Sequence, residues 1–375
     1  MSINKTVLLT LGRLPVALDI SRAFSAAGWR VIVADPWAMH LLRMSKSVTR
    51  CRVVDSPHPD PGNYCEQLAG ICDDEAVDLV VPVSEESVYV SALRDRGLPV
   101  FSMGQSKTLE LHDKARFIRL AESFHMPVPR TALANESPDF TRSTSFVSKP
   151  RFSCSGRGIR VHAAGVNVQA DEQTVLQEQL HGEHQSIFCV ARDGQLAAWA
   201  VYRPTLIDGS VSIAFESAPD SAAVVDWAKR FVGEINHTGL ISFDFIVEDD
   251  GRSLPIECNP RATSGIHFLT PETLLAAIVG DGSRLDMKPL PEQRLKESYS
   301  CFTRLLASAF SLERFRSIAN VMRSSRDITW QRSDPWPFLL MTVNSWRIIA
   351  KAMSREHSFA SASVADVEWR HRDLP

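Results

Sequence analysis

Short apolar runs alternate with amphipathic segments at the start of the chain. KTVLLTL (5–11) and WRVIVAD (29–35) are continuous apolar runs, which are typical of strands buried on both faces. Between them, residues 15–28 have apolar side chains at helical spacing, with Pro15 near the start and Gly28 at the end. A strand, a helix and a second strand in this order predict a βαβ unit with a parallel sheet.

The same alternation continues to about residue 105. We therefore expect an α/β fold whose first domain, residues 1–110, is an open parallel sheet of the Rossmann-like kind. The turn LGRLP after the first strand lacks the GxGxxG pattern of dinucleotide-binding folds, so a nicotinamide-dependent dehydrogenase is a weak interpretation. The remaining elements predicted for this domain are helices over 61–77 and 84–97 and strands over 78–83 and 98–103.

The pattern changes in the middle of the chain. One helix is predicted over 106–131, ended by Pro127 and Pro129, and a further helix over 221–236. The last ninety residues are expected to be mainly helical, with loops between the helices. The strands predicted for the middle part cover 144–150, 156–162, 174–180, 184–191, 196–204 and 211–217, followed by a strand pair within 240–259.

Composition and charge exclude several classes of protein. The chain has 375 residues, 44% of them apolar, with net charge −3 and a pI of about 6.4, which gives no charge signature for nucleic-acid binding. Residues 1–15 are expected to form a strand and a turn rather than a signal peptide, and 336–353 an amphipathic buried helix rather than a membrane span. Seven scattered cysteines without a CxxC pair favour reduced thiols and a cytoplasmic location.

The segment SLPIECNPRATSG (253–265) has the residues of a magnesium site. Glu257 and Asn259 are two positions apart at the end of a strand and therefore project from the same face. Asp244 can face the same way from the neighbouring strand, across the turn Asp249-Asp250-Gly251. Two carboxylates and an amide oxygen suit Mg²⁺, and Arg261 can neutralise a phosphoryl oxygen. The alternative is a hairpin with exposed acids, but it explains poorly why an acid follows the apolar LPI.

Two further segments have features of a nucleotide site. In FVSKPRFSCSGRGIR (146–160), Lys149 closes a strand, and a loop of small residues follows it. Such loops let backbone N–H groups approach phosphates, although glycine-rich hairpins are also common elsewhere. The backbone of VLQEQLHGEH (175–184) can contact an adenine edge, and an acid there can bind ribose hydroxyls; alone, it is an ordinary loop between strands.

Taken in this order, the motifs resemble those of the ATP-grasp superfamily over roughly residues 1–285, with ECNPR as the most specific segment. The resemblance, which is to carboxylate–amine ligases and the carbamoyl phosphate synthetase type, implies an ATP-grasp fold with a helical C-terminal extension. It divides the chain into a pre-ATP-grasp domain (1–110), an ATP-grasp domain (111–285) and the extension (286–375). Within the ATP-grasp domain, a lid subdomain covers about 140–182 and a metal and ATP subdomain about 183–285.

The resemblance also implies roles for single residues. Asp244, Glu257 and Asn259 would hold two Mg²⁺ ions, which Mn²⁺ can replace, and Lys114 and Lys149 would contact phosphates. The loop with Ser155 and Gly156 would cover the phosphates, and the segment Gln177, Glu178 and Leu180 would meet the adenine. Many relatives have an acid where this chain has His184, so either His184 or the preceding Glu183 binds the ribose, and Glu183 is favoured.

The family activity implied is an ATP- and Mg²⁺-dependent ligase that joins a carboxylate to an amine or other nucleophile through an acyl phosphate. Arg261 and Lys149 would stabilise charge, and His267 is a candidate base or an ordinary loop histidine. Arg203 is a candidate substrate ligand or a surface arginine, and Ser264 and Gly265 can offer backbone donors to a carboxylate. The partners expected are a small carboxylate and its nucleophile, with no nucleic acid and no membrane; a homodimer is left open.

Two alternatives keep the fold but change the activity. One is phosphoryl transfer to a different acceptor, such as a carbamate or an acid handed to a partner enzyme. The other is a non-catalytic ATP-binding protein, which would be expected to lack metal ligands, whereas the two acids and the amide of the motif are all present.

Overall fold

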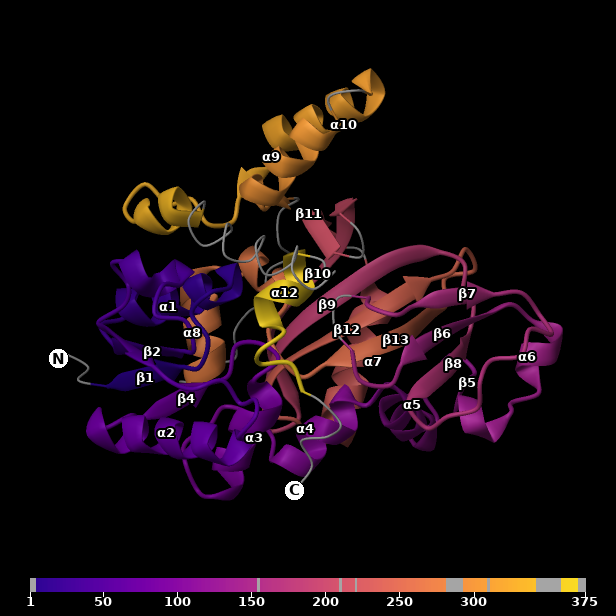
Figure 1. Ribbon diagram of the computed structural model, residues 1–375, viewed down its shortest axis with the longest axis horizontal. Helices are drawn as coiled ribbons and strands as arrows, with labels where there is room; N and C mark the ends of the chain where they lie inside the picture. The colour runs from indigo at the N-terminus through magenta and orange to yellow at the C-terminus, as the bar shows by residue number, and fades with distance from the viewer. Residues whose placement is uncertain are drawn as a thin grey trace.

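The computed structural model describes residues 5–153, 156–208, 211–219, 221–280, 293–308, 311–341 and 359–369. Three sheets organise these residues (Figure 1). The first has the strand order β3-β2-β1-β4, and all its strand pairs are parallel, as the βαβ pattern predicts. Its strands and its flanking helices are β1 (Thr6–Leu9), α1 (Pro15–Ala26), β2 (Arg30–Asp35), η1 (Leu41–Met44), β3 (Arg50–Val53), α2 (Pro61–Asp74), β4 (Leu79–Val81) and α3 (Ser87–Asp95).

A small antiparallel sheet with the order β5-β8-β6-β7 lies at the opposite end of the molecule from the first sheet (Figure 1). Two helices, α4 and α5, lead from the first sheet to it. The glycine-containing loop 151–159 connects β6 to β7, so this loop projects from the small sheet. The elements are α4 (Gln105–His112), α5 (Lys114–Ser123), β5 (Thr131–Leu133), η2 (Ala134–Glu136), α6 (Phe140–Ser143), β6 (Phe146–Pro150), β7 (Arg160–His162) and β8 (Thr174–Glu178).

The central sheet has the order β13-β12-β9-β10-β11-β14-β15 and is antiparallel except for its last pair. Helix α7 covers one face of this sheet, and α8 packs against both the sheet and α1, which joins it to the first domain. The elements are β9 (Glu183–Arg192), β10 (Gln195–Asp208), β11 (Val211–Ser217), α7 (Ala222–Glu234), β12 (Gly239–Val247), β13 (Ser253–Asn259), η3 (Ser264–Phe268), α8 (Pro271–Val279), β14 (Arg294–Lys296) and β15 (Arg326–Asp327).

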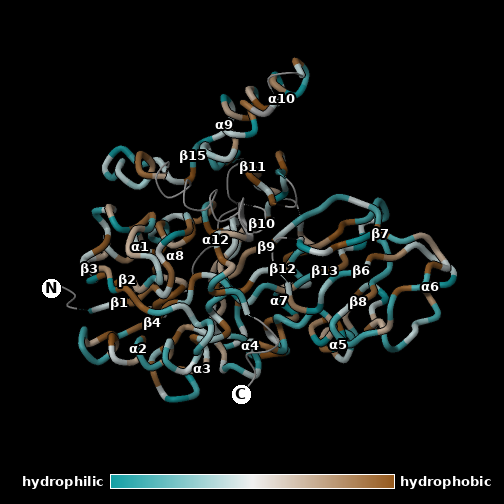
Figure 2. The backbone as a smooth tube through the Cα atoms, in the orientation of Figure 1, coloured by the Kyte–Doolittle hydropathy of each residue, from teal (hydrophilic) through white to brown (hydrophobic). Residues whose placement is uncertain are grey.

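The cores follow the pattern of apolar runs. One cluster joins the first sheet, α1, α8 and one face of the central sheet, and a second lies between the central sheet, α5 and α7. Figure 2 shows apolar positions along β1, β2 and β4 and a mixture of apolar and polar positions along α9 (Ser298–Ala307) and α10 (Leu312–Ser324). The mixed pattern fits the two helices, which extend away from the body (Figure 1).

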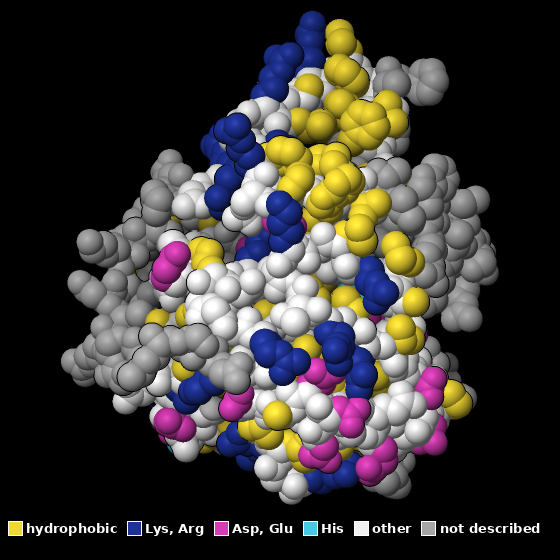
Figure 3. Space-filling view, turned by 90° about the vertical axis from the view of Figure 1, so that its left-hand side faces the viewer, with side chains coloured by type: hydrophobic (Ala, Val, Ile, Leu, Met, Phe, Trp, Pro, Cys, Tyr) yellow, Lys and Arg dark blue, Asp and Glu magenta, His cyan; other side chains and the backbone are white. Residues whose placement is uncertain are grey.

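The described residues of the C-terminal part are mainly helical, and the last described segment returns to the first domain. Helix α12 (Phe359–Val364) leads to Asp366, which forms an ion pair with Arg13 at 2.8 Å. Trp369 is buried against Tyr89 of α3, with ring centroids 4.9 Å apart. Hydrophobic side chains of α9, α10 and residues 330–339 remain exposed and form part of the surface in Figure 3, beside lysines and arginines.

Three expectations from the pattern are corrected. Residues 98–103 form no strand, because their pairing with the first sheet is limited to a bridge between Val80 and Val100. Strand β3 was missed because its sequence, RCRV, is a polar edge strand with no apolar run. The helix predicted over 106–131 is two helices, because the Asp113 side chain accepts hydrogen bonds from the backbone N–H groups of Ala115 and Arg116 and so starts α5 anew.

The prediction for 336–353 is described only in part. Residues 336–341 are helical, and the remainder lies outside the described residues. Within the described part of the chain, no helix has both the length and the apolar character needed to cross a bilayer.

Candidate functional site

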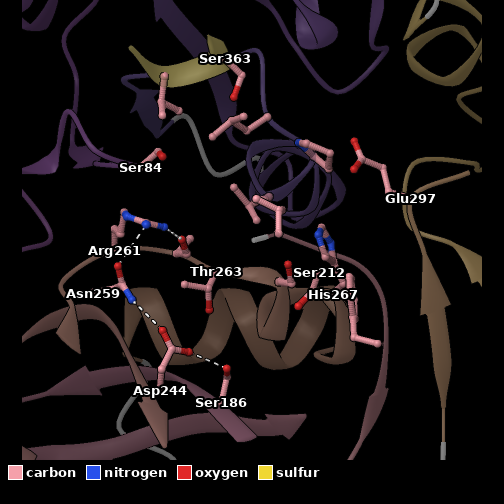
Figure 4. A pocket seen from close by; sticks show the side chains of 18 of the residues that line it. Ser84, Ser186, Ser212, Asp244, Asn259, Arg261, Thr263, His267, Glu297 and Ser363 are labelled. Carbon is pink, nitrogen blue, oxygen red and sulfur yellow. Dashed lines mark hydrogen bonds between the residues drawn. The ribbon is translucent and has the colours of Figure 1, made fainter. Parts of the chain in front are cut away.

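The β12–β13 hairpin brings the three predicted metal ligands together. Asp244 lies opposite Glu257 and Ser242 opposite Asn259, so the alternation of side chains places all of them on one face. Asp244 accepts hydrogen bonds from the Ser186 hydroxyl at 2.5 Å and from the Asn259 amide at 3.2 Å (Figure 4). These contacts fix the orientation of the Asp244 carboxylate at one end of a cavity.

The two facing carboxylates make a site suited to a cation. Burial raises the pKa of Asp244, and the adjacent Glu257 carboxylate raises it as well, against the opposing effect of His184. Among the described residues, no group of three or more His, Cys, Asp and Glu side chains is arranged around a common metal position. Two carboxylates and an amide nevertheless fit Mg²⁺, which uses few protein ligands and completes its shell with phosphate oxygens and water.

Two buried lysines lie beside these carboxylates. Lys149 at the end of β6 donates hydrogen bonds to the Gln177 side chain at 3.0 Å and to the Ile256 carbonyl at 2.7 Å. Lys114, the first residue of α5, donates to the Ser153 carbonyl at 2.7 Å and lies 3.3 Å from Glu257. Burial lowers the pKa of Lys149 to about 8, although the nearby Glu257 opposes this shift.

Arg261 is held by an acid that the sequence analysis missed. Its Nε lies 2.7 Å from Glu85, a buried residue that follows β4, and it also donates to the Asn259 side-chain oxygen at 3.0 Å. Burial raises the pKa of Glu85, but the charges of Arg261, His112 and Lys114 outweigh this effect and lower it overall. An ionised Glu85 therefore orients the guanidinium. The signal was present in SEES, because acids that follow a buried parallel strand lie at the edge where such sheets bind ligands.

A cavity of about 460 Å³ lies where the first sheet, the central sheet and the C-terminal segment meet. The face of the hairpin that has the predicted metal ligands forms one end of the cavity, with Asp244, Asn259 and Arg261 (Figure 4). His267, Ser212 and Glu297 lie at the other end. The remaining lining residues come from nearly every part of the chain, and include Arg13, Pro15, Leu41, Gly156, His184, Phe215, Ser264, Met341 and Ser363.

The η3 turn positions His267, and Gly265 is not among the residues that line the cavity. His267 lines the cavity, and its Nδ1 lies 2.5 Å from the Asp19 carboxylate of α1. A Cβ atom on Gly265 would lie 2.5 Å from the Cβ of Phe188, so glycine is required here for close packing. Ser264 lines the cavity, as the substrate-site expectation requires.

Several predicted residues lie away from the cavity. Glu183 pairs with Arg203 at 2.7 Å, and Arg203 pairs with Glu216 at 2.9 Å, which makes a ladder of partly exposed ion pairs. Because side chains alternate along β9, His184 shares the face of Ser186 and lines the cavity, whereas Glu183 does not. The geometry therefore favours His184 over Glu183 and the surface interpretation of Arg203.

The segment predicted to contact adenine lies only partly near Lys149, one of the two lysines predicted to contact phosphates. Gln177 contacts Lys149, whereas Glu178 is paired with Arg130 at 2.7 Å. Leu180 follows β8 and is partly buried. Gly156 of the predicted phosphate loop lines the cavity, and Ser155 lies outside the described residues.

Comparison with known proteins bears on the fold that holds these residues. Residues 111–265 match the family model of the ATP-grasp domain. A search of curated proteins finds no match. Among solved structures, the chain is similar to N5-carboxyaminoimidazole synthetase from Staphylococcus aureus complexed with ADP, with a TM-score of 0.63 and 14% identity over 78% of this chain and 82% of that one.

Two further structures extend the likeness. An L-amino acid ligase from Bacillus licheniformis has a TM-score of 0.60 and 13% identity, covering 78% of this chain and 79% of that one. The biotin carboxylase domain dimer of Hydrogenobacter thermophilus 2-oxoglutarate carboxylase, in complex with MgADP, ADP and bicarbonate, has a TM-score of 0.60 and 12% identity, covering 75% of this chain and 71% of that one. At these identities the likeness is one of fold.

The family model and the fold agree with the motifs quoted from the sequence. The expected α/β fold and its resemblance to the ATP-grasp superfamily are confirmed. The chain has the ATP-grasp fold, and its residues 111–265 match the model of the ATP-grasp domain.

Proposed function

We propose that the chain is an ATP- and Mg²⁺-dependent ligase that converts a carboxylate into an acyl phosphate for attack by an amine or other nucleophile. The observation that carries the proposal is the acid pair Asp244 and Glu257 between buried lysines, at the end of a cavity large enough for a small substrate. The ligands bound to one structural neighbour, MgADP and bicarbonate, are of the kinds that this reaction uses.

The residues have complementary tasks. Asp244, Glu257 and Asn259 would hold two Mg²⁺ ions, or Mn²⁺ in their place, and the metal would supply charge neutralisation at the transferred phosphoryl group. Lys114 and Lys149 would contact the phosphates, and Arg261, fixed by Glu85, would stabilise the anionic carboxylate and the acyl phosphate. The loop at Gly156 would cover the nucleotide.

The bond changes follow from this arrangement. A carboxylate oxygen of the substrate attacks the γ-phosphorus of ATP, and the bond to ADP breaks. The nucleophile then attacks the carbonyl carbon, a C–N bond forms when it is an amine, and the C–O bond to phosphate breaks. His267 would accept a proton from the nucleophile through its Nε2.

Trapping with hydroxylamine tests the proposal. Wild type is incubated with Mg·ATP, hydroxylamine and a panel of carboxylic acids, and both ADP and hydroxamate are measured. Hydroxamate with one acid is the expected result. ADP release without hydroxamate would favour phosphoryl transfer to another acceptor, and ATP binding without ADP release would favour a non-catalytic protein. A cytoplasmic location and a homodimer remain predictions.

A further inference from the structure

The end of the cavity opposite the metal site has its own chemistry. We call it the far end and define it by Ser212, Phe215, His267, Glu297, Ile328 and Met341. Its residues come from β11, η3, the C-terminal extension and the segment after β15. Figure 4 shows His267 and Glu297 on the side away from Asp244 and Arg261.

Glu297 is an acid at the far end that has no lysine or arginine partner among the described residues. It lies between β14 and α9, and its Oε2 accepts a hydrogen bond from Ser300 at 2.9 Å. It does not cap α9, because the Ser298 N–H donates to Asp327 instead, at 2.9 Å. The neighbouring Lys296 donates to the carbonyls of Met322 and Ser325, so its charge is directed away from Glu297.

The surroundings of Glu297 are unfavourable to an isolated negative charge. Burial raises the pKa of its carboxyl, and Asp327 raises it further, whereas Ser300 and His267 oppose the shift. Phe215, Ile328 and Met341 provide an apolar wall. A cation placed here would neutralise the charge of the buried carboxylate, and an apolar group attached to that cation would pack against the apolar wall.

Among the described residues that line the cavity, the arginines are Arg13 and Arg261, and Arg261 lies at the opposite end from Glu297. The charge of Arg13 is already matched by Asp35 at 2.6 Å and Asp366 at 2.8 Å. An anionic ligand would therefore find no unmatched arginine or lysine among the described residues of the far end. This favours a positively charged ligand over a negatively charged one.

His267 is arranged to accept a proton at the far end. Its Nδ1 lies 2.5 Å from the Asp19 carboxylate, and in a neutral imidazole that donates to this carboxylate Nε2 is the proton acceptor. Phe215 lies nearly parallel to the imidazole, with ring centroids 6.1 Å apart. Asp19 acts through His267 and is therefore a positioning residue.

We infer that the far end binds the nucleophile as a protonated amine with an apolar body, that Glu297 pairs with the ammonium group, and that His267 accepts its proton. The binding part stands on the cavity itself, and the catalytic part rests on the proposed ligase function. In the reaction, one proton of the ammonium goes to Nε2 of His267, and the free amine attacks the acyl phosphate. The second proton leaves with the released phosphate as the amide forms.

Equilibrium binding tests the inference without turnover. Hexylamine and phenethylamine are compared with hexanol and 2-phenylethanol by calorimetry, on wild type and on Glu297→Gln, which keeps the size of the side chain and the bond from Ser300. The amines should bind wild type at least about 10-fold more tightly than the alcohols, a preference that Glu297→Gln removes and Glu297→Asp partly restores. Glu313→Gln, at an exposed position of α10, is the matched control and should behave as wild type.

Equal binding of amines and alcohols to wild type, or an amine preference that survives in Glu297→Gln, would overturn the inference. The binding result does not depend on catalysis, so absence of hydroxamate with every acid would refute the ligase function and leave the subsite to be judged by binding. Where hydroxamate does form, Asp19→Asn should lower kcat for amide formation about 10-fold or more, with the KM of the amine and the rate of hydroxamate formation unchanged.

Discussion

The two ends of the cavity differ in how the chain builds them. One end, which we call the metal end, has the proposed metal ligands Asp244, Glu257 and Asn259, with Arg261 beside them. All four residues come from one hairpin and the positions just after it, so their spacing along the sequence was enough to predict the site. The far end takes residues from β11, η3, the position after β14 and the segments after β15, which no local pattern connects. We therefore assign the proposed phosphoryl chemistry to the hairpin of the ATP-grasp domain, and the choice of nucleophile to residues that this domain and the C-terminal extension share.

The largest effect is expected from removing the acid of the metal end. Glu257→Ala should lower ADP release about 10³-fold, because it removes a proposed metal ligand and leaves the buried Lys114 without its ion-pair partner. The measurement is steady-state ADP release with saturating Mg·ATP. Asp249→Ala, at the exposed turn of the same hairpin, should retain activity, and equal losses in both variants would show a structural cause.

Loss of the packing between the C-terminal segment and α3 should mainly affect stability. Trp369 is buried against Tyr89, so Trp369→Ala should lower the free energy of unfolding by about 3 kcal/mol. Trp330 is 50% exposed, and Trp330→Ala should cost less than about 1 kcal/mol. Urea titration gives both values, and equal values for the two variants would mean that the C-terminal segment is not docked on α3.

Replacement of Glu85, which orients Arg261, should change kcat more than the KM of ATP. Glu85→Gln should lower kcat about 10- to 100-fold with the KM of ATP nearly unchanged. Arg261 loses the carboxylate that orients it, whereas Lys114 and Lys149, the proposed phosphate contacts, remain. The neighbouring Glu86 accepts hydrogen bonds from Thr10 and Val83, so Glu86→Gln should change thermal stability more than kcat. A rise in the KM of ATP alone for Glu85→Gln would contradict this role.

The smallest effect is expected at the surface ladder. Arg203→Ala should change kcat/KM less than about 3-fold, because Arg203 pairs with Glu183 and Glu216 away from the cavity. His184→Ala at the cavity should raise the KM of ATP more than Arg203→Ala does. The reverse order would restore the substrate role first considered for Arg203.

Much of the fold could be predicted because its strands are apolar runs with clear turns. The hairpin with Asp244 and Glu257 is the best case, since alternation alone puts both acids on one face. Strand β3 and the break at Asp113 were missed because an edge strand needs no apolar run and a capping aspartate can interrupt an otherwise continuous helical pattern.

The site was predicted only where its residues are close in sequence. Glu85 lies far from Arg261 along the chain, and only the meeting of the first sheet with the central sheet makes them partners. Glu297 and Asp19 were missed for the same reason, because tertiary packing alone directs them toward His267 and the cavity. Conversely, Glu183 was favoured as the acid nearest to the expected motif position, which His184 occupies, but it points to the other face of β9.

Transfer of an oxygen atom tests the central claim most directly. The carboxylic acid found by hydroxylamine trapping is labelled with ¹⁸O in its carboxylate, and the reaction is run with Mg·ATP and an amine. If an acyl phosphate forms, one labelled oxygen per turnover appears in the released phosphate, because the C–O bond breaks on the acyl side. Label in AMP, or unlabelled phosphate with amide formed, would contradict an acyl phosphate intermediate.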